Sequence, residues 1–163
     1  MKKSLSVSRR TPVDHDYGTC DLTYVDMLIY PSELAHENVT ALLGIEPTVA
    51  CNKGDRIETA RGTVKVVPVT RWSLSSENDV MSKDVRAHLD WLLERLVPAR
   101  EGLFELQQHH EVKMAVDCTW WSRSGHGGPT LWPEQMRQLA ELNLECAFEI
   151  QFHPDGQIWD VLE

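Results

Sequence analysis

The stretch from Trp120 to Trp132 holds the residue types best suited to chemistry. Its sequence, Trp-Trp-Ser-Arg-Ser-Gly-His-Gly-Gly-Pro-Thr-Leu-Trp, combines three glycines with an arginine and a histidine. Successive glycines let backbone N–H groups approach an anion closely, and an arginine fork binds a carboxylate or phosphate. A histidine can move a proton near neutral pH. We therefore expect a ligand or partner site formed by Trp121, Arg123, His126, Gly127, Gly128 and Trp132.

Two interpretations of this loop remain open. In one, Trp121 and Trp132 form a stacking wall beside a small ligand or a partner. In the other, the loop is a mobile surface segment whose tryptophans pack at the edge of a sheet. The loop has no Walker or Gly-x-Gly-x-x-Gly pattern, and no Gly-x-Ser-x-Gly elbow accompanies the esterase-like triplet His126-Gly127-Gly128. The sequence therefore assigns no catalytic residue.

Other chemistry-bearing residues point to structural roles. His109, His110 and Glu111 are adjacent, and adjacent side chains of an extended segment point to opposite faces, so they cannot converge on a metal. No metal or cofactor is expected. Cys118 and Cys146 share the apolar phase of their strands, which favours buried thiols over a catalytic pair.

Alternation of apolar and polar side chains predicts the strands. The clearest are 111–121 and 145–153, whose apolar phase includes Val116, Cys118, Phe148 and Ile150 and is expected to face a helical layer. Further strands are expected at 21–30, at 64–73, where Pro68 indicates an edge position or a bulge, and at 158–162, with a hairpin excursion near 51–63.

Apolar residues spaced three and four apart predict the helices. One begins at Pro31 and stops at Gly44, the longest covers about 83–97, a short one follows Pro98, and the last begins at Pro133 with Met136, Leu139, Ala140 and Leu142 as its stripe. On the long helix, His88 and Trp91 are edge-of-core residues or a partner-binding ridge. Its solvated face is expected to carry Asp84, Asp90, Glu94 and Arg95.

Helices placed between strands with one-sided alternation indicate an α+β fold with two layers. We expect a largely antiparallel or mixed sheet with helices packed mainly on one face. A length of 163 residues suits one domain, assigned to 18–163, after a loosely ordered N-terminal tail at 1–17.

Charge and cysteine usage narrow the class of function. The formal net charge is −9, and an acidic body without a basic stripe disfavours nucleic acid. No apolar run approaches the ~20 residues that span a bilayer, and the basic N-terminal residues are not followed by the apolar core of a signal peptide. Four widely spaced cysteines without a Cys-x-x-Cys pair favour reduced thiols in a cytoplasm.

Four fragments carry a family resemblance. They are Leu42-Leu43-Gly44-Ile45-Glu46-Pro47, Arg71-Trp72-Ser73-Leu74-Ser75-Ser76, His88-Leu89-x-Trp91-Leu92-Leu93 with Leu96-x-Pro98, and the 131–144 helix leading into the last strand. In this order they resemble the bacterial family catalogued as domain of unknown function 4279, over roughly 21–153. The resemblance implies a small soluble α+β protein and brings no activity, cofactor or site residue. The loop at 122–130 looks longer and richer in glycine than the family pattern.

Two classes of function follow as hypotheses. The preferred one is a non-catalytic binding or interaction module that docks a basic protein partner, for instance an antidote-like protein occupying the basic active site of a toxin. The alternative is a small enzyme or ligand-binding protein that acts on an anionic small molecule, with Arg123, His126 and Asp117 around it. Either would be a monomer or a homodimer.

Overall fold

A five-stranded sheet forms the centre of the computed structural model, which describes residues 10–152 and 154. The strand order is β2-β5-β1-β6-β7, and all neighbours are antiparallel except β6 and β7, which run parallel. The five strands are β1 (Cys20–Tyr30), β2 (Val49–Cys51), β5 (Arg71–Ser75), β6 (Lys113–Ser122) and β7 (Glu145–Phe152). This mixed sheet confirms the expected α+β class.

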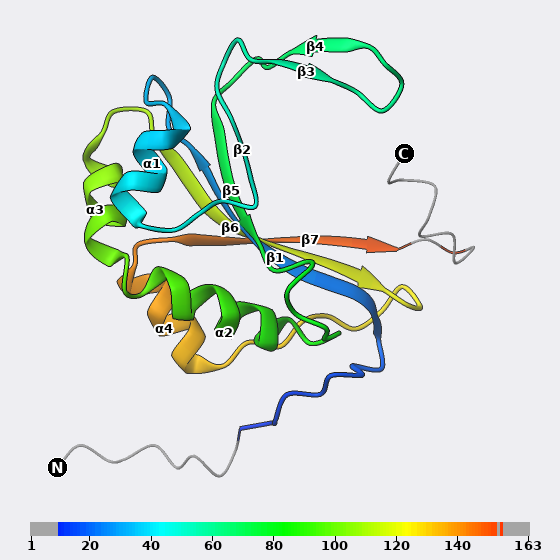
Figure 1. Cartoon of the computed structure of the whole chain (residues 1–163). Helices are drawn as coiled ribbons and strands as arrows, with labels where there is room; N and C mark the ends of the chain where they lie inside the picture. The colour runs from blue at the N-terminus through cyan, green and yellow to red at the C-terminus, as the bar shows by residue number, and fades with distance from the viewer. Residues whose placement is uncertain (1–9, 153, 155–163) are drawn as a thin grey trace, which may run out of the picture.

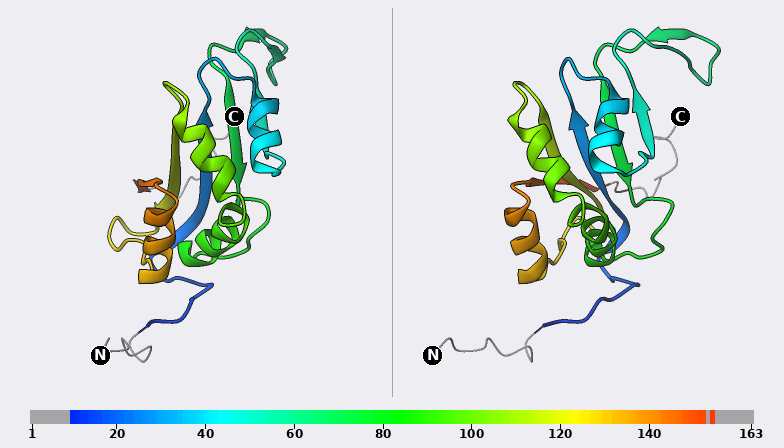
Figure 2. Two further views of the ribbon diagram at one scale, coloured as in Figure 1. Left: turned by 90° about the vertical axis from the view of Figure 1, so that its left-hand side faces the viewer. Right: turned by 60° about the vertical axis from the view of Figure 1, so that its left-hand side comes forward.

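All four helices lie on the same side of the sheet (Figures 1 and 2). They are α1 (His36–Leu43), α2 (Val85–Leu96), α3 (Arg100–Gln108) and α4 (Pro133–Glu141). The core lies between the two layers. Every second residue of β1, namely Val25, Met27 and Ile29, is fully buried there, and α2 contributes Leu89 and Leu92. The strand alternation and the helical stripe therefore meet as the sequence predicts.

A buried ion pair fixes the start of α2. Asp84 caps the helix by accepting a hydrogen bond from the Arg86 amide, and the Arg86 guanidinium donates to the same carboxylate, with Nε 2.9 Å from Oδ1. Burial alone would raise the pKa of Asp84, but the hydrogen bonds from Arg86 and Asp14 outweigh it and hold the pKa below its ordinary value. The expectation that Asp84 lies on a solvated face is therefore wrong, since the capping role removes it from water.

The N-terminal segment contacts this pair. Arg86 donates to the carbonyl of Thr11, 2.9 Å away, and the Trp132 indole N–H donates to the same carbonyl at 2.8 Å. The amide of Asp14 donates to Asp84. Sequence analysis assigns these residues to a tail, whereas in the structure residues 11 and 14 join α2 to the start of α4.

The stretch 64–73 contains parts of two strands where the sequence predicts one. Residues 64–66 belong to a separate hairpin, formed by β3 (Arg56–Glu58) and β4 (Val64–Val66), which confirms the hairpin excursion. Pro68 lies between β4 and β5. The prediction of one strand over 64–73, at an edge or bulged at Pro68, is wrong: Pro68 separates β4 from β5, and β5 is internal, with β2 and β1 on its two sides.

The first helix begins later than predicted. It starts at His36 rather than at Pro31, with Ala35 as its N-cap. Its end is as expected: Gly44 adopts a left-handed φ of 64° and donates its N–H to the carbonyl of Thr40 at 2.8 Å. Residues 31–35, which the pattern assigns to the helix, therefore form a loop.

The last strand departs most from expectation. Phe148, Ile150 and Phe152 were expected in the core, yet 42%, 55% and 46% of their surfaces are exposed. The reason is that β7 is an edge strand whose far end runs beyond the helices, as Figure 1 shows. Met136 and Ala140 on α4 are also exposed, and the buried side chains of that helix are Gln135 and Leu139. The strand expected at 158–162 lies outside the described residues.

Urea unfolding can compare how much the buried side chains of α2 and the exposed side chains of β7 stabilise the fold. Leu92→Ala should lower the free energy of unfolding by about 2–5 kcal/mol, because Leu92 is fully buried under the sheet. Ile150→Ala should lower it by less than about 1 kcal/mol, because that side chain already meets water. Equal losses in the two variants would contradict this placement of β7.

Candidate functional site

The second face of the sheet carries none of the four helices (Figures 1 and 2). We call it the open face. Because side chains alternate along each strand, its members follow from the register of the buried residues. They are Leu22, Tyr24, Asp26, Leu28 and Tyr30 of β1, Arg71, Ser73 and Ser75 of β5, Lys113, Ala115, Asp117, Thr119 and Trp121 of β6, and Glu145, Ala147, Glu149 and Gln151 of β7.

Two carboxylates stand directly opposite each other at the centre of the open face. The antiparallel register of β1 and β6 pairs Asp26 with Asp117. Directly opposed side chains on one face have Cβ atoms roughly 4.5–5.5 Å apart, and like charges in such a pair are destabilising. Both residues are only partly exposed. The pair therefore concentrates negative charge where water screens it incompletely.

Burial and neighbouring charges act on both carboxyls in the same direction. Burial raises the pKa of Asp26 above its ordinary value, and Asp117 and Glu77 raise it further, while a hydrogen bond with Ser75 and the charge of Arg71 oppose them. Burial also raises the pKa of Asp117, with Glu149 adding to the shift. At neutral pH the ionised pair is thus a source of free energy that opposes folding.

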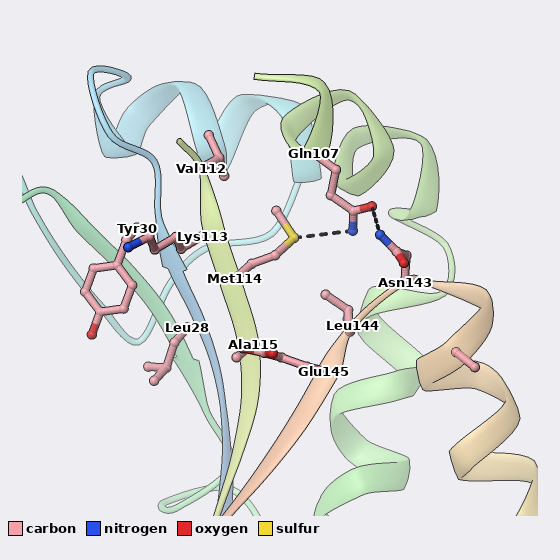
Figure 3. Close-up of a pocket in the computed structure, with 11 residues that line it drawn as sticks. Leu28, Tyr30, Gln107, Val112, Lys113, Met114, Ala115, Asn143, Leu144 and Glu145 are labelled. Carbon is pink, nitrogen blue, oxygen red and sulfur yellow. Dashed lines mark hydrogen bonds between the residues drawn. The ribbon is translucent and has the colours of Figure 1, made fainter. Parts of the chain in front are cut away.

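A pocket of about 850 Å³ opens beside this pair. Leu28 and Ala115, the next pair along the same two strands, line it, and Tyr30 and Lys113 border it toward the strand ends (Figure 3). The pocket exists because β7 pairs with β6 only from Ala115 onward, so the first residues of β6 have no strand on that side.

Polar groups close the helical side of the pocket. Gln107 of α3 donates from Nε2 to the carbonyl of Leu142 at 3.0 Å. Its Oε1 accepts from Nδ2 of Asn143 at 3.1 Å (Figure 3). Asn143 holds a left-handed φ of 53° in the turn before β7. The pocket thus joins an apolar floor to amide groups at one rim, a composition typical of binding sites. The acidic pair lies outside its lining, two residues further along the same strands.

In the predicted loop, the two charged candidates are already engaged with neighbours. The Arg123 guanidinium forms an ion pair with Asp21, with Nε 2.8 Å from Oδ1, and His126 Nδ1 hydrogen-bonds the hydroxyl of Ser124 at 2.9 Å. Asp21 occupies the position on the arginine fork that an anionic ligand would take. An anion at this loop would have to displace that carboxylate.

Close packing explains the glycine at position 127. Gly127 has a φ of 85°, and a Cβ there would stand 2.6 Å from the Thr19 hydroxyl. The carbonyl of Gly128 accepts a hydrogen bond from the Tyr17 hydroxyl at 3.0 Å. These contacts give Gly127 a structural reason for lacking a side chain, independent of any ligand.

The two loop tryptophans do not form one wall. Trp121 is buried on the open-face side of β6, opposite Leu22. Trp132 lies at the start of α4, where the guanidinium carbons of Arg10 and Arg86 stand 4.1 and 5.3 Å from its ring centre. The six residues of the predicted site therefore come together only in part: Arg123, His126, Gly127 and Gly128 share the turn, and the tryptophans anchor its ends in different layers.

The remaining sequence candidates are structural or unsupported. Among the described residues, no three His, Cys, Asp or Glu side chains are placed to hold one metal ion. His88 is buried in the core, where Nε2 lies 2.8 Å from the carbonyl of Ser82, so it is no exposed ridge. The thiols of Cys118 and Cys146 lie 3.6 Å apart, and Cys118 is fully buried. In the part of the chain that the structure describes, no helix is both long and apolar enough to cross a bilayer.

A family model described as Domain of unknown function (DUF4279) matches residues 21–153. The chain belongs to this family. The match confirms the resemblance read from the sequence, and the DUF4279 region contains the whole open face and the pocket. No curated protein and no solved structure matches the chain.

The sequence analysis missed Asp26 and the pocket. Asp26 is the one charged residue between Leu22 and Tyr30, within an otherwise apolar stretch of β1, and that interruption was an available signal. Its opposition to Asp117 depends on how β1 pairs with β6, which no local pattern specifies. The pocket depends on where β7 begins to pair, which is likewise a property of the assembled sheet.

Replacing Asp117 tests the electrostatics of the open face. Asp117→Asn should raise the free energy of unfolding at pH 7, because a raised folded-state pKa means that the ionised form opposes folding. Such a group contributes its stability below the unfolded-state value, about 3.9, and loses it as pH rises through the folded-state value. The gain over the wild type should therefore vanish toward pH 3, as followed by urea unfolding at both pH values.

Glu105→Gln, which removes the same charge from an exposed position on α3, is the matched control and should change little at either pH. A loss of stability in Asp117→Asn at pH 7 would show that the carboxylate is favourably partnered, contrary to this account.

Proposed function

We propose that this DUF4279 chain is a non-catalytic binding module that docks a basic partner on its open face. The observation that carries the proposal is the opposed pair of Asp26 and Asp117 on a sheet face without helices. A cationic side chain placed over the pair relieves the repulsion that the folded chain otherwise bears alone. Residues whose ionisation opposes folding are typical of functional surfaces, where stability is given up for binding.

The surroundings of the pair suit a partner segment that carries both charge and apolar bulk. Glu149 extends the negative charge on β7, and the pocket lined by Leu28 and Ala115 lies immediately along the strands. A lysine or arginine bound at the pair would place a neighbouring aliphatic side chain of the partner at the pocket. The net charge of −9 favours the approach of such a partner from a distance.

The open face is favoured over the loop at 122–132 as the site. On the loop, Arg123 forms an ion pair with Asp21. On the open face two carboxylates face each other, and the charge of Arg71 and the hydrogen bond with Ser75 offset only part of what raises the pKa of Asp26. A basic protein partner, of which a toxin with a basic active site is one case, fits this surface. The cysteine pattern supports a cytoplasmic location, and the family resemblance supports a bacterial source.

An NMR titration of the ¹⁵N-labelled full chain tests the proposal. The probe is a short unstructured peptide of alternating arginine and leucine, and its matched control replaces each arginine with glutamate. The arginine peptide should shift amides of β1, β6 and the start of β7, and its affinity should fall as salt rises. The glutamate peptide should leave these amides unmoved.

Variants locate the contact. Asp26→Asn and Asp117→Asn should each weaken binding of the arginine peptide, while Glu105→Gln on α3 should not, although it changes the net charge equally. Shifts confined to residues 122–132, or equal binding of both peptides, would overturn the proposal. Binding of the glutamate peptide at those residues would favour the anion-binding alternative.

A further inference from the structure

The β3–β4 hairpin carries a charge opposite to the rest of the chain. Residues 53–66 hold four basic side chains against two acidic ones, a net charge of +2 in a chain of −9. Lys53, Arg56, Arg61 and Lys65 are all exposed, and among the described residues none of them forms an ion pair. The hairpin is therefore a basic arm on an acidic body.

Apolar side chains accompany these charges. Ile57, Val64 and Val66 are 50%, 56% and 61% exposed. The register of the hairpin places Arg56 beside Val66 on one face and Lys65 beside Ile57 on the other. Each face of the arm thus presents a cation next to an aliphatic group, the combination that suits the acidic pair and its neighbouring pocket.

The hairpin stands apart from the core. Figure 1 shows it extending beyond the end of the sheet, away from the helices, and none of the residues in β3 and β4 is buried. An isolated two-stranded hairpin is marginally stable in water, and three apolar side chains on it gain nothing from their exposure. Packing against another surface would stabilise both strands.

We propose that the β3–β4 hairpin of one copy docks on the open face of a second copy, so that the chain forms a two-fold dimer. The inference rests on the function proposed above and names one occupant for the same surface. Charge complementarity argues for it: the arm is the basic, exposed apolar part of the molecule, and Asp26 and Asp117 form the acidic centre of the open face.

Two-fold symmetry strengthens this arrangement. In an isologous dimer each copy gives its arm and receives the other, so the contact between the hairpin and the acidic pair forms twice. The occupied face is then unavailable to an external basic partner. Such a partner and the second copy compete, and dissociation of the dimer exposes the site.

Sedimentation velocity of the full chain at low salt, across a concentration series, tests the dimer. The wild type should approach twice its 18.6 kDa mass and dissociate as salt rises. Arg56→Glu combined with Lys65→Glu should weaken the dimer at least about tenfold, because whichever face of the hairpin docks then carries a negative charge that the acidic pair repels. Arg100→Glu combined with Arg137→Glu changes the net charge equally at exposed positions of α3 and α4, and should leave the dimer intact.

The arginine–leucine peptide separates this inference from the proposed function. The hairpin variant should still bind the peptide on the open face, and more tightly than the wild type because its own arm no longer competes. A wild type that remains monomeric at every concentration while binding the peptide overturns the dimer and leaves the binding function standing. A dimer that survives the hairpin variant but not the α3 and α4 variant also overturns it.

Discussion

The antiparallel register of β1 with β6 decides which side chains of these strands face the helices and which lie on the open face. Because strand side chains alternate, a shift of one residue would exchange the two faces of the sheet. The observed register sends Val25 and Cys118 to the helical layer and sets Asp26 against Asp117 on the open face. The same register produces both the burial of the apolar side chains and the repulsion of the acidic pair. The free energy gained by the burial outweighs the free energy lost to the repulsion.

The repulsion within the acidic pair therefore lowers the stability of the fold, and the burial of the core outweighs this loss. The four helices cover one face over β1, β5 and β6, where buried side chains of the strands and of α2 stabilise the fold, and the open face is left to carry charge. The buried pair of Asp84 and Arg86 shows the opposite balance. There each oxygen of the Asp84 carboxylate accepts hydrogen bonds from a guanidinium or a backbone amide. These bonds offset the energetic cost of burying the charges. Among the described residues no salt bridge joins Asp26 or Asp117 to a cation, and the charge of Arg71 only partly offsets the raised pKa of Asp26. This contrast supports the proposal that the open face binds a partner.

Much of the fold follows from local patterns in the sequence, and most of the site does not. The alternation in β6 and the stripe of α2 predict both elements within two residues, and Gly44 ends α1 as its type requires. Pro68 indicates an edge position or a bulge, whereas in the structure it lies in the connection between β4 and β5, and β5 is internal. The exposure of Phe148 and Ile150 depends on how far the helices reach over β7. The pairing of Asp26 with Asp117 depends on long-range register, which no window along the chain contains.

A carboxyl ¹³C NMR titration of the folded chain addresses the central claim most directly. It follows the ionisation of Asp26 in the wild type and in Asp117→Asn. We predict that Asp26 ionises above its ordinary pKa in the wild type, and that its pKa falls toward that value when the opposing carboxylate is removed. A wild-type Asp26 that ionises at or below its ordinary pKa, or one that is insensitive to position 117, would contradict the claim that these two groups oppose each other across the open face.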